Sequence, residues 1–130
     1  MLGRKDFTRE ETDSAKASVA QQLAAFRKLR NPGELEPVFF NAAVLALDRR
    51  FVHRVRMVTG KGGTPLNELE LLTTALMEHD GVFTTDSVIR YDASAAVVGL
   101  APGDRVALTA QQFGDLADGV FAELAEKFSE

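Results

Sequence analysis

The fold of this chain is decided by the stretch Pro37-Val-Phe-Phe-Asn-Ala-Ala-Val-Leu-Ala-Leu-Asp-Arg-Arg-Phe-Val-His-Arg-Val-Arg-Met-Val58. Its first half, residues 38–47, is hydrophobic on every side except at Asn41. A helix of this kind is typical of a position surrounded by other elements. Its second half is amphipathic and basic. We therefore predict a central helix over residues 37–58, with its front end in the core and arginines exposed at its back end.

Three further helices are predicted from their start signals and their apolar spacing. Thr8 with Glu11, and Thr109 with Gln112, form the capping-box pattern at which helices begin. Pro65 suits the first position of a helix and follows a threonine that can act as its N-cap. The expected helices span about Arg9–Leu29, Pro65–His79 and Thr109–Phe128.

The first and last of these helices differ in the width of their apolar stripes. In residues 9–29 only Val19, Leu23 and Phe26 follow helical spacing, with alanines between them. In residues 109–128 the apolar residues share one face, and the opposite face, which includes Glu123, is acidic and typical of a solvated surface. The narrow first stripe indicates a helix that needs a partner to cover it.

Residues 82–108 lose the helical period. They contain short β-favouring runs at 88–91, 96–100 and 105–108, and Pro102 with Gly103 is a type II turn signal between the last two. We expect a β-hairpin or a small three-stranded meander here. The predicted fold is therefore mainly α (α+β by strict count), a bundle of four principal helices in a single globular domain over residues 1–130, with about the first seven residues flexible.

Composition limits the class of protein. The 130 residues are 45% hydrophobic and 26% charged with a net charge of -4, which is typical of one soluble globular domain. The chain contains no cysteine, which excludes disulfides, thiolate metal sites and cysteine nucleophiles. Its longest apolar run, residues 38–47, is half of the roughly 20 residues a membrane span needs. With no export signal at the amino terminus, we expect a cytoplasmic protein that does not contact a membrane.

One basic cluster lies in the second half of the central helix and just after it. Its members are Arg49, Arg50, His53, Arg54, Arg56 and Lys61, with no acidic residue among them. The helical residues of this cluster project to one broad face that can bind phosphates or an acidic protein surface. The alternative is that these cations stabilise the helix dipole and are simply solvated. No aromatic residue interleaves with the arginines to stack on bases.

A glycine-rich turn follows this cluster. The turn Gly60-Lys61-Gly62-Gly63-Thr64 is not a P-loop, because both the spacing and the preceding helix are wrong for one. It still leads into a helix amino terminus, where N–H groups can hold an anion. A flexible connection between helices is the alternative. The anion-binding residues of this hypothesis are the basic cluster together with Gly62, Gly63 and Thr64.

We predict no catalytic residue, no metal site and no cofactor. Neither His53 nor His79 belongs to a metal-binding pattern, and no serine lies in a nucleophile motif. Carboxylates such as Asp48 and Glu68 could still converge in space. Asn41, if buried, must find partners for its amide, and it either fixes helix register or lines a small pocket.

The leading hypothesis from the sequence is a non-enzymatic interaction protein that forms a homodimer. The reasons are the missing catalytic patterns and the narrow stripe of residues 9–29. The alternative is binding of an anion or nucleic acid through the basic cluster and the glycine-rich turn. A second alternative is a small-molecule enzyme without a recognisable motif, with Asn41, His53, Glu68 and His79 as loose candidates.

Overall fold

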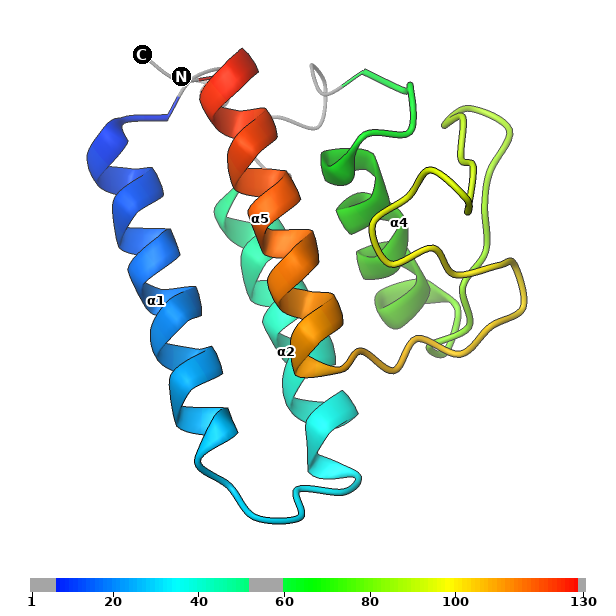
Figure 1. Cartoon of the computed structure of the whole chain (residues 1–130). Helices are drawn as coiled ribbons and strands as arrows, with labels where there is room; N and C mark the ends of the chain where they lie inside the picture. Colours follow the sequence, from blue (N-terminus) through cyan, green and yellow to red (C-terminus); the bar gives the residue numbers. More distant parts are fainter. Residues whose placement is uncertain (1–6, 52–59, 129–130) are drawn as a thin grey trace.

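The computed structural model describes residues 7–51 and 60–128, and these residues form a bundle of four α-helices (Figure 1). The helices are α1 (Arg9–Arg27), α2 (Leu35–Arg50), α4 (Pro65–Glu78) and α5 (Ala110–Lys127). The prediction of a mainly helical bundle is confirmed for this part of the chain. None of the helices in these residues is long and apolar enough to cross a membrane.

The predicted helix starts are present as hydrogen-bonded caps. The Thr8 hydroxyl accepts from the Glu11 N–H at 3.1 Å, and the Glu11 carboxylate accepts from the Thr8 N–H at 2.8 Å. Thr109 and Gln112 repeat this arrangement at the start of α5. At α4 the reciprocal partner of the N-cap is Asn67, which the sequence analysis did not identify. Each of these signals is local, because the two partners are three residues apart.

The central helix differs from its predicted bounds. It begins at Leu35 instead of Pro37, because the Leu35 and Glu36 N–H groups bond back to Pro32 and Gly33 and wind an extra turn. In the described residues it ends at Arg50, and Phe51 has non-helical dihedrals of -126° and -64°. Residues 52–58 of the predicted helix lie outside the described residues, as do residues 1–6 of the segment predicted to be flexible.

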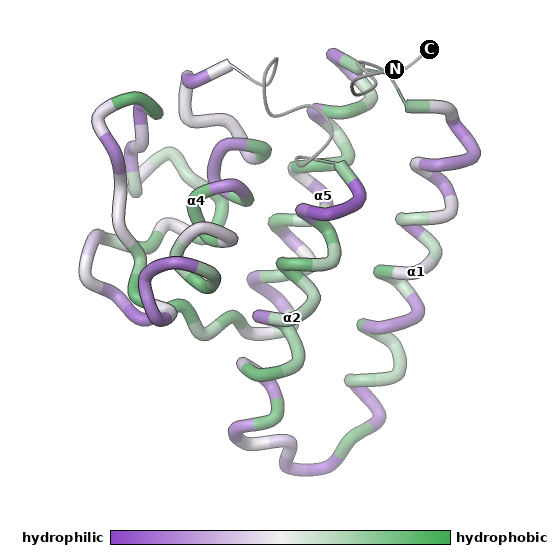
Figure 2. The backbone as a smooth tube through the Cα atoms, turned by 180° about the vertical axis from the view of Figure 1, so that it is seen from behind, coloured by the Kyte–Doolittle hydropathy of each residue, from purple (hydrophilic) through white to green (hydrophobic). Residues whose placement is uncertain are grey.

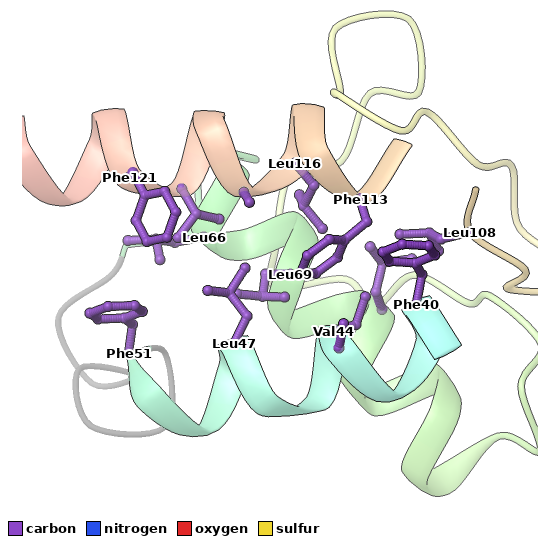
Figure 3. Close-up of a cluster of buried hydrophobic side chains, with 14 of the residues drawn as sticks. Phe40, Val44, Leu47, Phe51, Leu66, Leu69, Leu108, Phe113, Leu116 and Phe121 are labelled. Carbon is purple, nitrogen blue, oxygen red and sulfur yellow. The ribbon is translucent and has the colours of Figure 1, made fainter. Parts of the chain in front are cut away.

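The core fills the space between α2, α4 and α5 (Figure 3). Phe40 from α2 packs against Phe113 from α5 with ring centroids 5.5 Å apart, and Phe51 meets Phe121 edge-on at 6.0 Å. Leu108 and aliphatic side chains from the three helices complete the cluster. These side chains are Val44 and Leu47 of α2, Leu66 and Leu69 of α4, and Leu116 of α5. Apolar burial on this scale is the main stabilising contribution to the bundle.

Helix α1 is the peripheral member of the bundle and packs mainly along α5 (Figure 1). Ala15 and Phe26 are its buried residues, which agrees with the narrow stripe seen in the sequence. Phe26 meets Phe40 edge-on at 4.8 Å. Phe7, which the sequence analysis included in the flexible segment, is buried instead, and its N–H donates to the Phe128 carbonyl at 2.7 Å.

The predicted β-hairpin or meander is not confirmed. Residues 82–108 are all described, and among them the structure contains one isolated bridge, between Val82 and Arg105, and no strand. We call this segment the connector. Several backbone N–H and C=O groups of the connector form hydrogen bonds with side chains instead of with a neighbouring strand. These hydrogen bonds hold its β-favouring residues in place.

Glu68 of α4 supplies the main set of these contacts. Its carboxylate is buried, with 3% of the residue exposed, and it accepts the N–H groups of Val97 at 2.8 Å, Val98 at 2.9 Å and Gly99 at 3.1 Å. Three consecutive donors converging on one ionised group replace the ladder that a hairpin would have provided. Residues 97–99 are therefore held by a helix and not by a strand.

Asn41 of α2 fixes the end of the connector. Its side-chain amide donates to the Val106 carbonyl at 2.8 Å, and its side-chain oxygen accepts from the Leu108 N–H at 3.3 Å. The amide thus pairs with the connector as a strand backbone would. Asn41 therefore positions the end of the connector beside α2, a role that was not among those considered for it from the sequence.

Tyr91 packs inside the connector. Its hydroxyl donates to the Leu100 carbonyl at 2.6 Å, and its ring lies 5.0 Å from that of Phe83. Burial, and then the charges of Glu68, Asp104 and Asp92, raise the pKa of Tyr91 to about 12. The hydroxyl therefore keeps its proton and its donor role at neutral pH.

Gly63→Ala is expected to destabilise the protein by about 2 kcal/mol or more. Gly63 has a φ of +83°, and a Cβ at this position would overlap the carbonyl oxygen of Arg90. Gly62→Ala is the matched control, because a Cβ there meets nothing within 4 Å. Urea unfolding of both variants measures the difference. Equal stability of the two would contradict the close approach of residues 63 and 90.

Candidate functional site

One side of α2 carries exposed apolar side chains. Phe40, Val44 and Leu47 face the core and are almost fully buried. On the opposite side, Val38 is 67% exposed and Leu35 is 47% exposed. The expectation that α2 is enclosed on every side is thus wrong for the described structure. A helix that is apolar all round is normally covered all round, so this exposed side is an unpartnered apolar face.

The residues on this side of α2 follow a regular spacing. They recur at alternating intervals of three and four residues, at 35, 38, 42, 45 and 49, with Ala46 beside them. This is the spacing of a helix that packs against another helix. We name this surface the outer face of α2 and define it as Leu35, Val38, Ala42, Leu45, Ala46 and Arg49. Leu45 is half-buried and the other five are exposed. Figure 2 shows the predominantly apolar character of α2 beside the mixed character of α1.

A narrow hollow continues the outer face of α2 toward α1. It has a volume of about 50 Å³ and is lined by residues of both helices and by Phe113 at its floor. Ala46 belongs to both surfaces, and Ala15, Ser18, Val19 and Gln22 form the α1 wall. The hollow therefore adjoins the exposed apolar side of α2 and has both apolar and polar side chains on its wall.

The two ends of this surface carry opposite charges. Glu34, the N-cap residue of α2, is exposed at one end, and Arg49 is exposed at the other. Leu29, in the connection between α1 and α2, adds a further exposed apolar side chain near the Glu34 end. The surface is thus apolar along its length, acidic at the amino end of α2 and basic at the carboxyl end.

The structure places the predicted basic cluster only in part. Arg49 and Arg50 are exposed and line a hollow of about 240 Å³ together with Glu11 and Ser14 of α1. His53, Arg54 and Arg56 lie outside the described residues. Lys61 is exposed in different surroundings: its carbonyl accepts from the Arg90 N–H at 2.7 Å, and its charge acts on Asp86.

The last two N–H groups of the glycine-rich turn, and one in the first turn of α4, donate to acceptors within the protein. The N–H groups of Gly63 and Thr64 donate to the Asn67 side-chain oxygen at 2.9 and 3.2 Å. The Leu66 N–H donates to the buried carboxylate of Glu123 at 2.9 Å. A carboxylate from α5 thus occupies the position at the start of α4 where an external anion would bind.

Glu123 of α5 is buried, although the sequence predicted that it would be exposed. The sequence analysis placed it on the acidic outer face of that helix, but only 6% of the residue is exposed. One oxygen of its carboxylate caps α4 and the other pairs with Lys127 at 3.0 Å. A helical projection of α5 alone could not identify this role, because Leu66 is 57 residues away.

The remaining candidates have structural roles or are exposed. Asn41 and Glu68 bond to the connector backbone as described above, and Asp48 is buried. His79 is exposed and lines an open hollow of about 390 Å³ with Asp86, whose pKa is lowered by the N–H groups of Ile89 and Val88. Within residues 7–51 and 60–128, no group of three or more histidine, aspartate or glutamate side chains could hold a metal ion.

No protein-family model, curated protein or solved structure matches this chain. Among the described surfaces, the outer face of α2 has the clearest physical requirement for a partner, because its apolar side chains gain free energy when they leave water.

Proposed function

We propose that this chain is a non-enzymatic interaction protein that forms a homodimer, with the outer face of α2 as its docking surface. The observation that carries this proposal is the 67% exposure of Val38 on a helix that is apolar on nearly all sides. Burial of a valine or leucine side chain contributes about 1.5–3 kcal/mol. In a symmetric dimer every such residue is buried twice, so a few of them supply a useful affinity.

Val38→Lys is expected to weaken dimerisation by about 100-fold, because it removes an apolar contact and places an ammonium group in the interface. Native mass spectrometry and analytical ultracentrifugation over a dilution series measure the dissociation constant. The matched control is Val88→Lys, because Val88 is 60% exposed but lies in the connector. A wild-type protein that stays monomeric at all accessible concentrations would overturn the proposal, and so would equal effects of the two variants.

The second candidate function is binding of an anion or nucleic acid by the basic residues. The exposure of Arg49, Arg50 and Lys61 supports it. It predicts that affinity for a short DNA duplex falls steeply between low and moderate salt and is lost in the Arg49→Glu/Arg50→Glu variant. Fluorescence anisotropy measures both effects. Equal binding by the variant and the wild type would exclude these arginines as the site.

A further inference from the structure

We infer that the two copies pack antiparallel through α2, about a two-fold axis at Ala42, with Glu34 of each copy beside Arg49 of the other. This inference rests on the proposed homodimer and specifies its geometry. In a two-fold interface the same patch meets itself, so a residue on one side of the axis meets the residue equally far on the other side. On the outer face of α2, this rule pairs Val38 with Ala46 and Leu35 with Arg49 when the axis passes through Ala42.

The apolar residues are complementary about Ala42. Val38 lies four residues before Ala42 and Ala46 lies four residues after it, so an antiparallel pairing sets the larger side chain of one copy against the smaller side chain of the other. At the axis, Ala42 meets its own copy, and two alanines let the helix axes approach to about 8 Å. A parallel pairing would set Val38 against Val38 and leave a gap between the alanines of position 46.

The charges select the same orientation. Glu34 and Arg49 are exposed at opposite ends of α2, which spans 16 residues, or about 24 Å. Glu34 lies eight residues before Ala42 and Arg49 lies seven after it, so an antiparallel pairing sets the glutamate of one copy within one residue of the other copy's arginine along the helix. It also opposes the two helix dipoles. A parallel pairing would bring like charges together at both ends. Charge pairs at the rim of an interface determine orientation more than they add affinity.

The size of the surface indicates a dimer that dissociates on dilution. A stable interface buries about 800 Å² per partner, which is more than one face of a 24 Å helix offers. The interface must therefore also include surface beside this face, and the hollow between α1 and α2, with Ser18, Val19 and Gln22 on its α1 wall, adjoins it. Leu29 in the connection between these helices is exposed and available for the same contact.

Single-cysteine cross-linking tests the orientation, and the chain is well suited to it because it has no cysteine of its own. Under mild oxidation, Ala42→Cys is expected to form a disulfide-linked dimer, since the two sulfur atoms meet at the axis. Val38→Cys alone is expected to stay unlinked, because its two copies lie about 12 Å apart along the helix. A mixture of Val38→Cys and Ala46→Cys is expected to link across the interface.

Charge reversal is the second test and requires no oxidation. Glu34→Arg and Arg49→Glu are each expected to weaken the dimer by about 10-fold, and the double variant is expected to return within about threefold of the wild type. Circular dichroism of each variant confirms that it is folded. A double variant that is weaker than both single variants would overturn the Glu34–Arg49 pairing.

The outcomes separate this inference from the proposed function. If the wild type is a monomer, the proposed function fails and the inference fails with it. If the wild type is a dimer that Val38→Lys weakens, but Val38→Cys links to itself as readily as Ala42→Cys, the copies are parallel and only the inference fails. If it is a dimer in which neither cysteine links, the copies meet through another surface, and both the inference and the docking surface of the proposed function are overturned.

Discussion

Phe40→Ala is expected to lower the free energy of unfolding by about 4 kcal/mol. Phe40 has no exposed surface and stacks on aromatic rings from α1 and α5 as well as on its own neighbour. Removing the ring leaves a cavity where three helices meet, and the helices cannot collapse around it without losing their other contacts. Since small domains have about 5–15 kcal/mol of stability in total, this loss is a large fraction.

Urea unfolding followed by far-ultraviolet circular dichroism measures this effect. Phe40→Leu is the graded control, with an expected loss of about 1.5 kcal/mol, because leucine fills part of the volume. Met77→Ala, at an exposed position of α4, should change stability by less than about 0.5 kcal/mol. A loss below about 1 kcal/mol for Phe40→Ala would contradict the described packing.

Glu68→Ala is expected to cost about 3 kcal/mol and to release the connector. The variant removes the acceptor of three consecutive N–H groups, at residues 97–99. Hydrogen bonds to a charged acceptor are stronger than neutral ones, and the lost contacts are partly offset because the buried carboxylate no longer has to be desolvated. The helices themselves keep their core contacts, so the change should be concentrated in the connector.

Hydrogen exchange shows where the change occurs. The amides of Val97, Val98 and Gly99 should exchange at least about tenfold faster in Glu68→Ala than in the wild type, at pH values where both are folded. Glu68→Gln should be intermediate, since its amide keeps one acceptor oxygen but loses the charge. Glu78→Ala, at an exposed position of the same helix, is the control. Unchanged exchange at residues 97–99 would show that Glu68 does not hold them.

The features that sequence reasoning predicted are local ones. The caps at Thr8 and Thr109 each depend on a partner three residues away, so their residue pattern is sufficient to identify them. The apolar stripe of α5 was also recovered, because helical spacing determines which of its residues share a face. These local signals gave the number of helices in the described residues and most of their bounds.

The features that sequence reasoning missed depend on distant residues. Glu123 was assigned to solvent because nothing near it in the sequence points to Leu66. The connector was assigned to strands because its residues favour β structure, but Glu68 and Asn41 supply the partners that a strand would have supplied. β-Propensity shows that a side chain suits a half-buried surface. The connector offers its side chains such a surface, although its backbone forms no strand-to-strand hydrogen-bond ladder.

The apolar run at residues 38–47 was interpreted correctly as a helix and incorrectly as a fully enclosed one. Its composition shows that every side tends to be buried, but it does not show whether the covering surface belongs to the same chain or to another. The inner side at Phe40 and Val44 is covered within the chain. The outer side at Val38 is not, and it is this side that the proposed dimer would cover.

The position of Tyr91 gives this protein a natural optical label. The chain contains one tyrosine and no tryptophan, so fluorescence excited at wavelengths longer than phenylalanine absorbs comes from a single ring in the connector. The helices α1, α2, α4 and α5 dominate the far-ultraviolet circular dichroism. Fluorescence and dichroism therefore follow two different parts of the same molecule, and any separation of the two signals during refolding would give the order in which bundle and connector form.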